Sequence, residues 1–287
     1  MNSAFKGLIF GTAGIPLSTS PASTLHALDR LKELGLSCLE VELVRGFRFS
    51  RETAMAIRRR AEELGIILSA HAPYSINFLS AEPGKRLSSQ EQLLSSARLA
   101  ELCGIRNLVF HGGFYGTNPP DKALEILSET LKNIISILRS EKNRVILRLE
   151  TMGKKSQFGT LEEILSLCQE IEELQPCLDF SHLYAREGEL NGYQQFSRVL
   201  NKVAKKLGED VLHDLHLHIS GIEFGEKGEI KHLNLKEADL RWEEWIMALH
   251  DRGVAGRVIC ESPSLEADAL CLQNLYLAYK EKSKKFF

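Results

Sequence analysis

The sequence predicts a single-domain (β/α)8 barrel, the TIM-barrel fold, over the whole chain of 287 residues. Short apolar runs alternate with longer segments of helical period from one end of the chain to the other. Signals at the segment ends agree, since Ser50 and Thr160 stand at expected N-caps and Gly35 and Gly65 follow expected helices. No proline- or serine-rich linker interrupts the series. An open doubly wound sheet remains the competing fold, because periodicity alone does not exclude it.

Each repeat is expected to begin with a strand and to continue as an amphipathic helix. The strands are assigned to the apolar runs, and the helices to the stretches in which apolar residues recur every three or four positions. In chain order the expected strands are 8–10, 38–43, 66–70, 107–110, 145–149, 177–180, 215–219 and 258–260. The expected helices between and after them are 24–34, 52–64, 89–103, 123–138, 161–174, 193–207, 242–252 and 266–282.

Composition restricts the class of protein. The chain is 44% hydrophobic and 26% charged, with a formal net charge of −2, so it can build a large core and is not a polycation. Its six cysteines form no C-x-x-C pair, and we expect reduced core residues in a cytoplasmic monomer. No apolar run reaches the ~20 residues that span a bilayer, and no leader is evident, so no membrane attachment is expected.

Side chains that can bind a metal stand at the ends of expected strands or in the loops that follow them. In a parallel barrel these positions meet at one mouth, where reactive groups lie. Five imidazoles and three carboxylates suit zinc or manganese and need no thiolate. Collecting this much potential charge without a cation would be costly for every unpaired group, so we expect bound metal. The candidate ligands are His71, His111, Glu150, Asp179, His182, His218, His232 and Glu261.

The seventh strand leaves one ligand ambiguous. His216 shares strand parity with His218, and His213 lies just before the expected strand, so either of these two is an alternative ligand. We prefer His218, because it is nearest the end of the strand, and keep His216 as the alternative.

The number of candidates favours a multinuclear centre. Glu150, Asp179, His218 and Glu261 suffice for one hard divalent ion, which leaves four histidines without a role. Further ions, about 3.5–4 Å apart, would account for them and would activate a hydroxide and stabilise the leaving oxygen of a phosphoester. We therefore expect phosphoester hydrolysis, with Glu150 and Glu261 as the catalytic carboxylates.

The segment 71–77, His-Ala-Pro-Tyr-Ser-Ile-Asn, resembles the first zinc-histidine motif of the endonuclease IV family. The ordered set of His111, Glu150-Thr151, Asp179-Phe180-Ser181-His182, His218, His232 and Glu261 matches the same family over about residues 8 to 262. The resemblance implies an enzyme that uses two or three zinc ions, with manganese as an alternative. It implies base-excision repair, in which double-stranded DNA is cleaved on the 5′ side of an abasic site.

The resemblance also distributes the ligands among the ions. One zinc would take His71, His111 and Glu150, and a second would take Glu150, Asp179, His218 and Glu261, with Glu150 bridging. The third would take His182 and His232.

The third site departs from the family pattern. The family usually has an aspartate two residues before the histidine matched by His232, and this chain has Ile230. Unless Glu229 or water replaces that carboxylate, we expect the third metal to bind more weakly.

DNA contacts are expected around the same mouth. Tyr74 matches an aromatic residue that the family uses against damaged DNA. Basic residues in the expected loops would contact phosphates and make the affinity salt-dependent. These residues are Arg45, Arg48, Lys154, Lys155, Lys227 and Lys231.

Two other functions remain open. Glu150, Asp179, His218 and Glu261 resemble the single-metal centre of xylose isomerase-like sugar epimerases, in which two carboxylates hold the ion and move a proton next to a carbonyl. A DNA-damage binding module that lost a metal is the non-catalytic alternative. One bound ion would favour the epimerase, and two or three would favour the nuclease.

Overall fold

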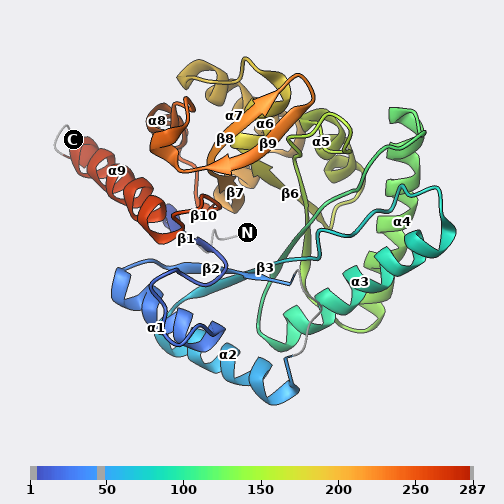
Figure 1. The fold of residues 1–287 in the computed structure, drawn as a ribbon, viewed down its shortest axis with the longest axis horizontal. Coiled ribbons are helices and arrows are strands. Elements are labelled where there is room, and N and C mark those ends of the chain that lie inside the picture. The colour runs from blue at the N-terminus through green and yellow to red at the C-terminus, as the bar shows by residue number, and fades with distance from the viewer. Residues whose placement is uncertain (1–4, 44–48, 285–287) are drawn as a thin grey trace.

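Eight parallel strands close into a barrel in the computed structural model, which describes residues 5–43 and 49–284. The strand order is β1-β10-β7-β6-β5-β4-β3-β2, and β1 pairs with both β2 and β10 (Figure 1). The predicted (β/α)8 barrel is therefore confirmed, and the open sheet is excluded. The barrel strands are β1 (Leu8–Ala13), β2 (Cys38–Glu42), β3 (Ile67–His71), β4 (Asn107–Phe110), β5 (Ile146–Glu150), β6 (Leu174–Asp179), β7 (Leu215–Ile219) and β10 (Gly256–Cys260).

Helices surround the barrel and bury their apolar faces against it. The strands β4 and β7 are buried along their whole length, as expected for parallel strands that are covered on both faces. The outer helices are α1 (Thr24–Leu34), α2 (Arg51–Leu64), α3 (Pro83–Leu102), α4 (Pro120–Ser140), α5 (Leu161–Glu170), α7 (Tyr193–Leu207), α8 (Trp242–Asp251) and α9 (Glu266–Lys284).

The predicted helix signals act as caps. The Ser50 hydroxyl accepts a hydrogen bond from the Thr53 N–H at 3.2 Å, and Thr160 forms a capping box with Glu163. Gly35 and Gly65 end α1 and α2 with φ of 74° and 69°, in the left-handed region that glycine tolerates.

Proline accounts for three wrong helix boundaries and one wrong strand start; in addition, β1 continues to Ala13 instead of residue 10, and β10 begins at Gly256 instead of residue 258. The predicted helix 161–174 ends at Glu170, and β6 begins at Leu174 instead of residue 177. Pro176 favours an extended conformation at the residue before it, so the helix cannot continue to that point. The helices α3 and α4 begin earlier than expected, with Pro83 and Pro120 in their first turn, where a missing N–H costs nothing.

The sequence reasoning missed several elements after β6 and β7. Helix α6 (Phe180–Glu187) shows no amphipathic period, because its first six residues are all buried. A β-hairpin of β8 (Gly221–Gly225) and β9 (Gly228–Leu233) follows β7. Two glycines flank its tight turn, a signal that sequence reasoning had available. The remaining elements are the 3₁₀ helices η1 (Glu209–His213) and η2 (Leu235–Glu237).

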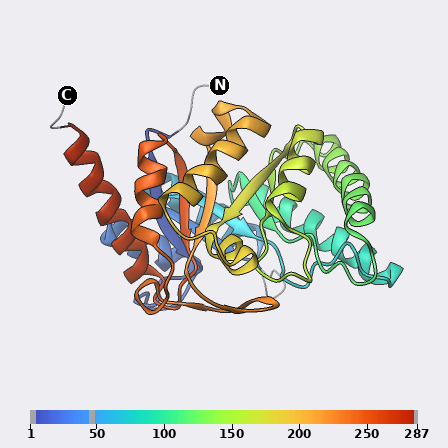
Figure 2. The ribbon, with the colours of Figure 1, turned by 90° about the horizontal axis from the view of Figure 1, so that it is seen from above.

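The hairpin marks the functional end of the barrel. In Figure 1 it lies in front of the barrel strands, and in Figure 2 it runs along the lower edge, across the end where the parallel strands terminate. This is the end at which a (β/α)8 barrel carries its site.

The buried cysteines agree with the expectation of core residues. Five of the cysteines are buried, Cys271 is partly buried, and all six are free thiols. Within residues 5–43 and 49–284, no helix is both long enough and apolar enough to cross a bilayer.

Candidate metal centre

Glu150 at the end of β5 lies between two sets of predicted ligands. Its Oε2 lies 3.0 Å from Nε2 of His71, which ends β3, and 2.9 Å from Nε2 of His111, which follows β4. Its Oε1 lies 3.3 Å from Nδ1 of His218 in β7. Because its two oxygens face different histidines, Glu150 occupies the position of a bridging carboxylate.

A second group of donors surrounds the other side of Glu150. Donor atoms of Glu150, Asp179, His218 and Glu261 all lie within 4.8 Å of one another. The Nδ1 of His218 lies 3.1 Å from Oε1 of Glu261. Asp179 Oδ2 is buried and accepts no hydrogen bond from the described residues. A buried carboxylate oxygen without a donor is costly, and a cation at this point would satisfy it.

His182 and His232 form a third group with Glu229. The Nε2 atoms of the two histidines lie 3.3 Å apart, and Glu229 carboxylate oxygens lie 3.5 Å and 3.8 Å from them. His182 lies in α6 rather than in a loop, and Asp179 caps that helix by accepting the His182 N–H at 2.7 Å. His232 lies in β9.

A bulge in the hairpin selects Glu229 for this group. Phe224 pairs with Glu229 and Glu223 pairs with Lys231, so Ile230 is left between them and is 58% exposed. An extra residue shifts the alternation of side chains, so that Glu229 and His232, three positions apart, face the same way. The carboxylate that the sequence lacks at position 230 is thus provided by its neighbour.

Glu40 of β2 contacts both His218 and His216. Its Oε1 lies 2.9 Å from Nε2 of His218, and its Oε2 lies 2.8 Å from Nε2 of His216 and accepts the Ser69 hydroxyl at 2.7 Å. All four side chains are buried. A proton on Nε2 of His218 leaves Nδ1 free for a metal, as in carboxylate–histidine–metal arrangements. His216, the alternative ligand, is instead directed at Glu40.

Cys177 also lies near His216 and His218, and the three form a further group of possible donors. Burial raises the pKa of the Cys177 thiol well above its usual range in the metal-free protein.

Sequence reasoning missed Glu40 and Glu42. Both stand in the apolar run of β2, and a carboxylate in a buried strand is the signal that could have identified them. Glu42 accepts the Tyr74 hydroxyl at 2.8 Å, and burial raises the pKa of Glu42 to about 7.

The charged groups of the centre shift one another's pKa values. Burial alone would lower the pKa of His71, but the Glu150 carboxylate outweighs it and raises this pKa to about 9. Burial likewise opposes ionisation of Glu261, and His218 outweighs it, so the pKa of Glu261 falls to about 2. In the metal-free protein the Glu150 carboxylate therefore favours a protonated His71, whereas burial lowers the pKa of His111, and a metal would bind only the neutral imidazoles.

The donor set fits divalent metal ions. Carboxylates and imidazoles converge in buried positions, and Oδ2 of Asp179 accepts no hydrogen bond from the described residues, although it lies 3.5 Å from Nδ1 of His182. Nitrogen and oxygen donors of this mixture suit zinc or manganese.

The expected DNA-binding residues differ in their surroundings. Tyr74 is 52% exposed at the mouth, with its ring stacked on His111 at 5.5 Å and 21°. Lys154 and Lys227 are brought together, because the loop after β5 pairs with the hairpin turn. Lys231 forms an ion pair with Glu223 at 3.1 Å, which reduces its free charge. Lys155 is exposed beside Lys154, and Arg45 and Arg48 lie outside the described residues.

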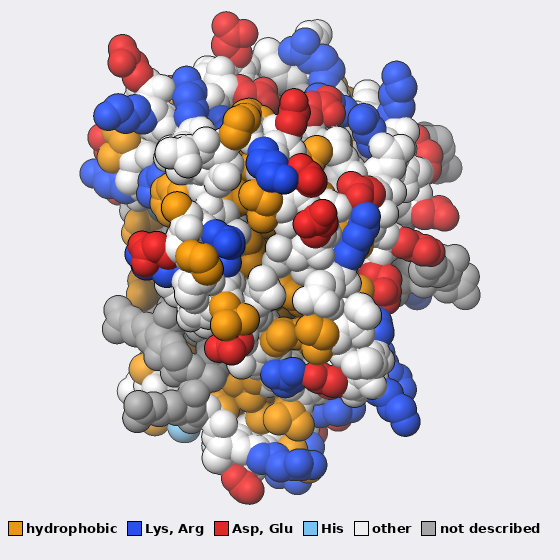
Figure 3. All heavy atoms as spheres, turned by 90° about the vertical axis from the view of Figure 1, so that its right-hand side faces the viewer, with side chains coloured by type: hydrophobic (Ala, Val, Ile, Leu, Met, Phe, Trp, Pro, Cys, Tyr) orange, Lys and Arg blue, Asp and Glu red, His pale blue; other side chains and the backbone are white. Residues whose placement is uncertain are grey.

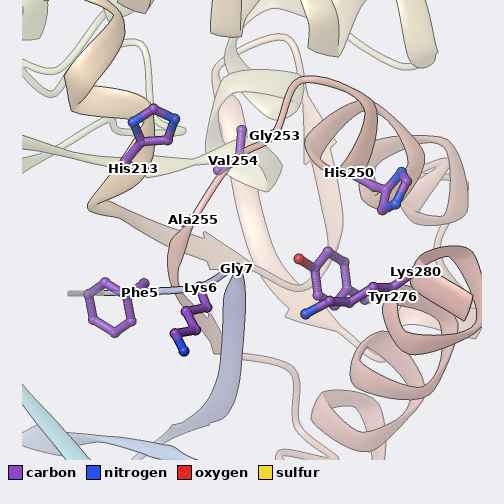
Figure 4. A pocket seen from close by; sticks show the side chains of 10 residues that line it. All are labelled: Phe5, Lys6, Gly7, His213, His250, Gly253, Val254, Ala255, Tyr276 and Lys280. Carbon is purple, nitrogen blue, oxygen red and sulfur yellow. The ribbon is translucent and has the colours of Figure 1, made fainter. Parts of the chain in front are cut away.

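Two other surfaces differ from the mouth. On the side shown in Figure 3, acidic and basic side chains are interspersed, in keeping with the small net charge. A cavity of about 370 Å³ lies at the opposite end of the barrel, where Lys6, His213, His250, Tyr276 and Lys280 are among the lining residues (Figure 4). No carboxylate lines this cavity in the described part of the chain, so it does not resemble the donor groups above.

Sequence comparisons identify relatives along most of the chain. A family model described as xylose isomerase-like TIM barrel matches residues 28–276. An uncharacterized protein of Methanocaldococcus jannaschii is 40% identical over 94% of this chain and 97% of its own length. A probable endonuclease 4 of Mycoplasma genitalium is 27% identical over 69% of this chain and 67% of its own length.

Solved structures with the same fold come from two functional classes. Endonuclease IV from Thermus thermophilus has a TM-score of 0.71 at 23% identity, covering 94% of this chain and 99% of the other. A D-tagatose 3-epimerase-like protein has a TM-score of 0.73 at 17% identity, covering 96% of this chain and 98% of the other. At these identities the likeness establishes the fold and leaves the chemistry to the site.

Proposed function

This chain belongs to the xylose isomerase-like TIM barrel family, and we propose that it is a metal-dependent endonuclease acting at abasic sites in double-stranded DNA. Hydrolysis would occur at the phosphodiester on the 5′ side of the lesion, as part of base-excision repair. The proposal is supported by the probable endonuclease 4 relatives and by the donor groups at the barrel mouth.

The main supporting observation is that Glu150 is shared by two donor groups while a third group lies beside them. A single-metal epimerase would need only Glu150, Asp179, His218 and Glu261. It would leave the paired histidines His71 and His111, and the His182–Glu229–His232 group, without a role. Several ions explain all of these residues.

The residues divide the work of phosphodiester cleavage. Bound zinc or manganese ions would supply an activated hydroxide near neutral pH and stabilise the charge on the leaving oxygen. Glu150 and Glu261 would be the catalytic carboxylates that set the positions of the ions, and Glu40 would orient His218. Lys154, Lys227 and the basic residues Arg45 and Arg48 would contact phosphates, while Tyr74 would pack against the exposed sugar.

An abasic nucleotide suits a buried centre of this kind. A sugar without a base has lost its stacking and pairing, so moving it out of the duplex costs less than for an intact nucleotide. The exposed ring of Tyr74 would then lie between the solvent and the extruded sugar.

The first test is cleavage of a duplex that carries one tetrahydrofuran abasic analogue. The zinc-loaded protein should nick the strand on the 5′ side of the analogue. Protein from which a chelator has removed the metal should give no product, and neither should the zinc-loaded protein acting on an intact duplex. Replacing a residue that only supports a metal ligand typically lowers activity roughly 10- to 100-fold. Glu261→Gln changes an expected ligand itself, so it should lower kcat/KM by more than that. Binding of the lesion without cleavage would instead support the damage-binding module.

A sugar epimerase is the second candidate, because the four-ligand group and the epimerase-like fold neighbour both accommodate it. Metal analysis of the purified protein separates the two proposals. One tightly bound ion together with epimerisation of a ketohexose would replace the nuclease assignment, and two or three ions would support it.

A further inference from the structure

A second cleft adjoins the metal centre on the side of Tyr74. It has a volume of about 350 Å³, within the range of small-molecule sites. Its lining comes from three consecutive parts of the barrel: the loop after β3, the start of α3 and the loop after β4. The residues are Tyr74, Ser75, Ile76, Asn77, Lys85, Ser88, Ser89, Gln92 and Phe114.

Two aromatic rings at this cleft are exposed to solvent. Tyr74 is 52% exposed and Phe114 is 44% exposed, although most of the large apolar side chains in the described residues are buried. Tyr74 is stacked on His111 and therefore forms the wall between the cleft and the metal centre. Phe114 stands three residues after His111 and lines the same cleft. Exposed rings beside a reactive centre are typical of surfaces that stack on planar ligands.

Hydrogen bonds and a close approach of two loops fix the backbone at Phe114. The Phe114 N–H donates to Oδ1 of Asn77 at 3.2 Å, and the Leu79 N–H donates to the same atom at 3.1 Å. Gly113 has φ of 105°, and a Cβ there would lie 2.2 Å from Oδ1 of Asn77. Glycine is therefore required for the two loops to approach this closely.

The same contacts fix the Asn77 amide. With Oδ1 occupied by two backbone donors, the Nδ2 group must be the other end of the amide. Nδ2 makes no hydrogen bond to the described residues, so this donor is available at the lining of the cleft. A fixed donor beside an exposed ring matches the carbonyl edge and the face of a nucleobase.

We propose that this cleft is a nucleotide subsite, in which Phe114 stacks on the base that flanks the cleaved phosphodiester and Asn77 donates a hydrogen bond to that nucleotide. The inference rests on the proposed function, since it assumes that the DNA strand crosses the metal centre. It adds a contact with an undamaged base, whereas the metal centre itself acts on the sugar–phosphate backbone. Sequence-independent stacking would allow any base at this position.

The test combines a change in the protein with a change in the DNA. Binding of zinc-loaded protein is measured by fluorescence anisotropy, with a methylphosphonate in place of the scissile linkage. One duplex carries a single tetrahydrofuran. Two further duplexes carry a second tetrahydrofuran in place of the neighbouring nucleotide, one on the 5′ side and the other on the 3′ side of the first. The proteins are wild type, Phe114→Ala, Phe114→Trp and the control Leu277→Ala, whose side chain on α9 is 46% exposed.

Removal of the flanking base should weaken binding by wild type about ten-fold on one side of the lesion. Phe114→Ala should bind the single-lesion duplex about ten-fold more weakly than wild type. Its affinity should not fall further when the flanking base is removed. Phe114→Trp should restore the dependence on the base, and Leu277→Ala should behave as wild type.

The outcomes separate the two proposals. If wild type cleaves the single-lesion duplex but Phe114→Ala keeps the full dependence on the flanking base, the subsite is refuted and the nuclease stands. The subsite is refuted in the same way if wild type binds all three duplexes equally. If wild type neither binds nor cleaves the single-lesion duplex, the proposed function fails and the subsite fails with it.

Discussion

At the scale of single residues, the role of a side chain in the centre depends on where its individual atoms lie, and the residue type alone does not determine it. Glu150 lies between two donor groups because its two oxygens face different histidines, and His218 presents Nδ1 because Glu40 faces its Nε2. His216 has the same residue type and strand parity as His218, yet it is directed at Glu40 within the barrel. The sequence supplies the imidazoles, and their neighbours determine which nitrogen of each is free.

Glu229 is predicted to hold the third metal. Glu229→Gln should lower the bound stoichiometry by one ion and leave the other two in place, as measured by atomic emission after gel filtration. The control Glu226→Gln changes an exposed glutamate at the turn of the same hairpin and should have no effect. Adding Ile230→Asp to Glu229→Gln should not restore the ion, since residue 230 lies in the bulge and is exposed. Restoration would show that the bulge does not fix the ligand.

Metal binding is predicted to release protons and to weaken as the pH falls. An imidazole must be neutral to bind a metal, and in the metal-free protein the Glu150 carboxylate raises the pKa of His71 to about 9. Below this pH a proton is displaced, so affinity should fall by about ten-fold per pH unit for each such proton. Titration calorimetry in buffers of different ionisation enthalpy should show more proton release at pH 7 than at pH 9.5. Equal release at the two pH values would contradict the assignment.

At the scale of elements, the β8–β9 hairpin completes the centre. Its turn pairs with the loop after β5, where Gly228 and Lys154 form a bridge. A Cβ on Gly153 would lie 2.7 Å from Cβ of Glu229 and 3.1 Å from Cδ2 of His182. The hairpin can therefore bring Glu229 to His182 only because residue 153 has no side chain.

Gly153→Ala is predicted to impair the third group selectively. The added methyl group should displace Glu229 and lower the affinity for one ion at least ten-fold. The cost to folding should stay near 1 kcal/mol, because the hairpin lies outside the barrel core. Gly84→Ala is the matched control, since a Cβ at that position meets nothing within 4 Å. Metal titration and thermal unfolding of both variants check the prediction, and unchanged metal binding in Gly153→Ala would exclude the clash as a determinant.

The third metal is also predicted to leave first during mild chelation. His232 keeps 25% of its side chain exposed, while His71 and His218 are almost fully buried, and the third carboxylate comes from a two-stranded hairpin. Stepwise chelation followed by metal analysis should therefore show loss of one ion before the other two. Three ions lost together would contradict this order.

At the scale of the whole molecule, bound metals would link the ends of separate strands. Donors come from β3, β5, β6, β7 and β9, from helix α6, and from positions just after β4 and β10. Ions that bind only this folded arrangement stabilise it by mass action.

Metal removal is accordingly predicted to lower the melting temperature. Zinc at about 100 times its Kd should add about 2.7 kcal/mol per ion, a shift of several degrees for a chain of this size. Asp179→Asn should reduce this zinc-dependent shift, because Oδ2 lies in the second donor group, and the exposed His26→Ala should keep it. The check is differential scanning calorimetry with zinc and with chelator, and an Asp179→Asn protein that keeps the full shift would exclude that ligand.

The sequence by itself determined the barrel and the meeting of the predicted donors. Eight alternations of strand and helix predicted a closed parallel sheet, which the structure confirms, and such a sheet places the ends of all its strands at one mouth. Residues far apart, such as Glu150 and Glu261, therefore came together as expected from strand position alone.

Only the tertiary structure decided the bulge that turns Glu229 toward His232, the buried contact of Glu40 with His218, and the capping of α6 by Asp179. Each depends on pairing register or packing between distant segments. Periodicity along the chain describes which residues are apolar, and it contains no information on which partner a side chain meets.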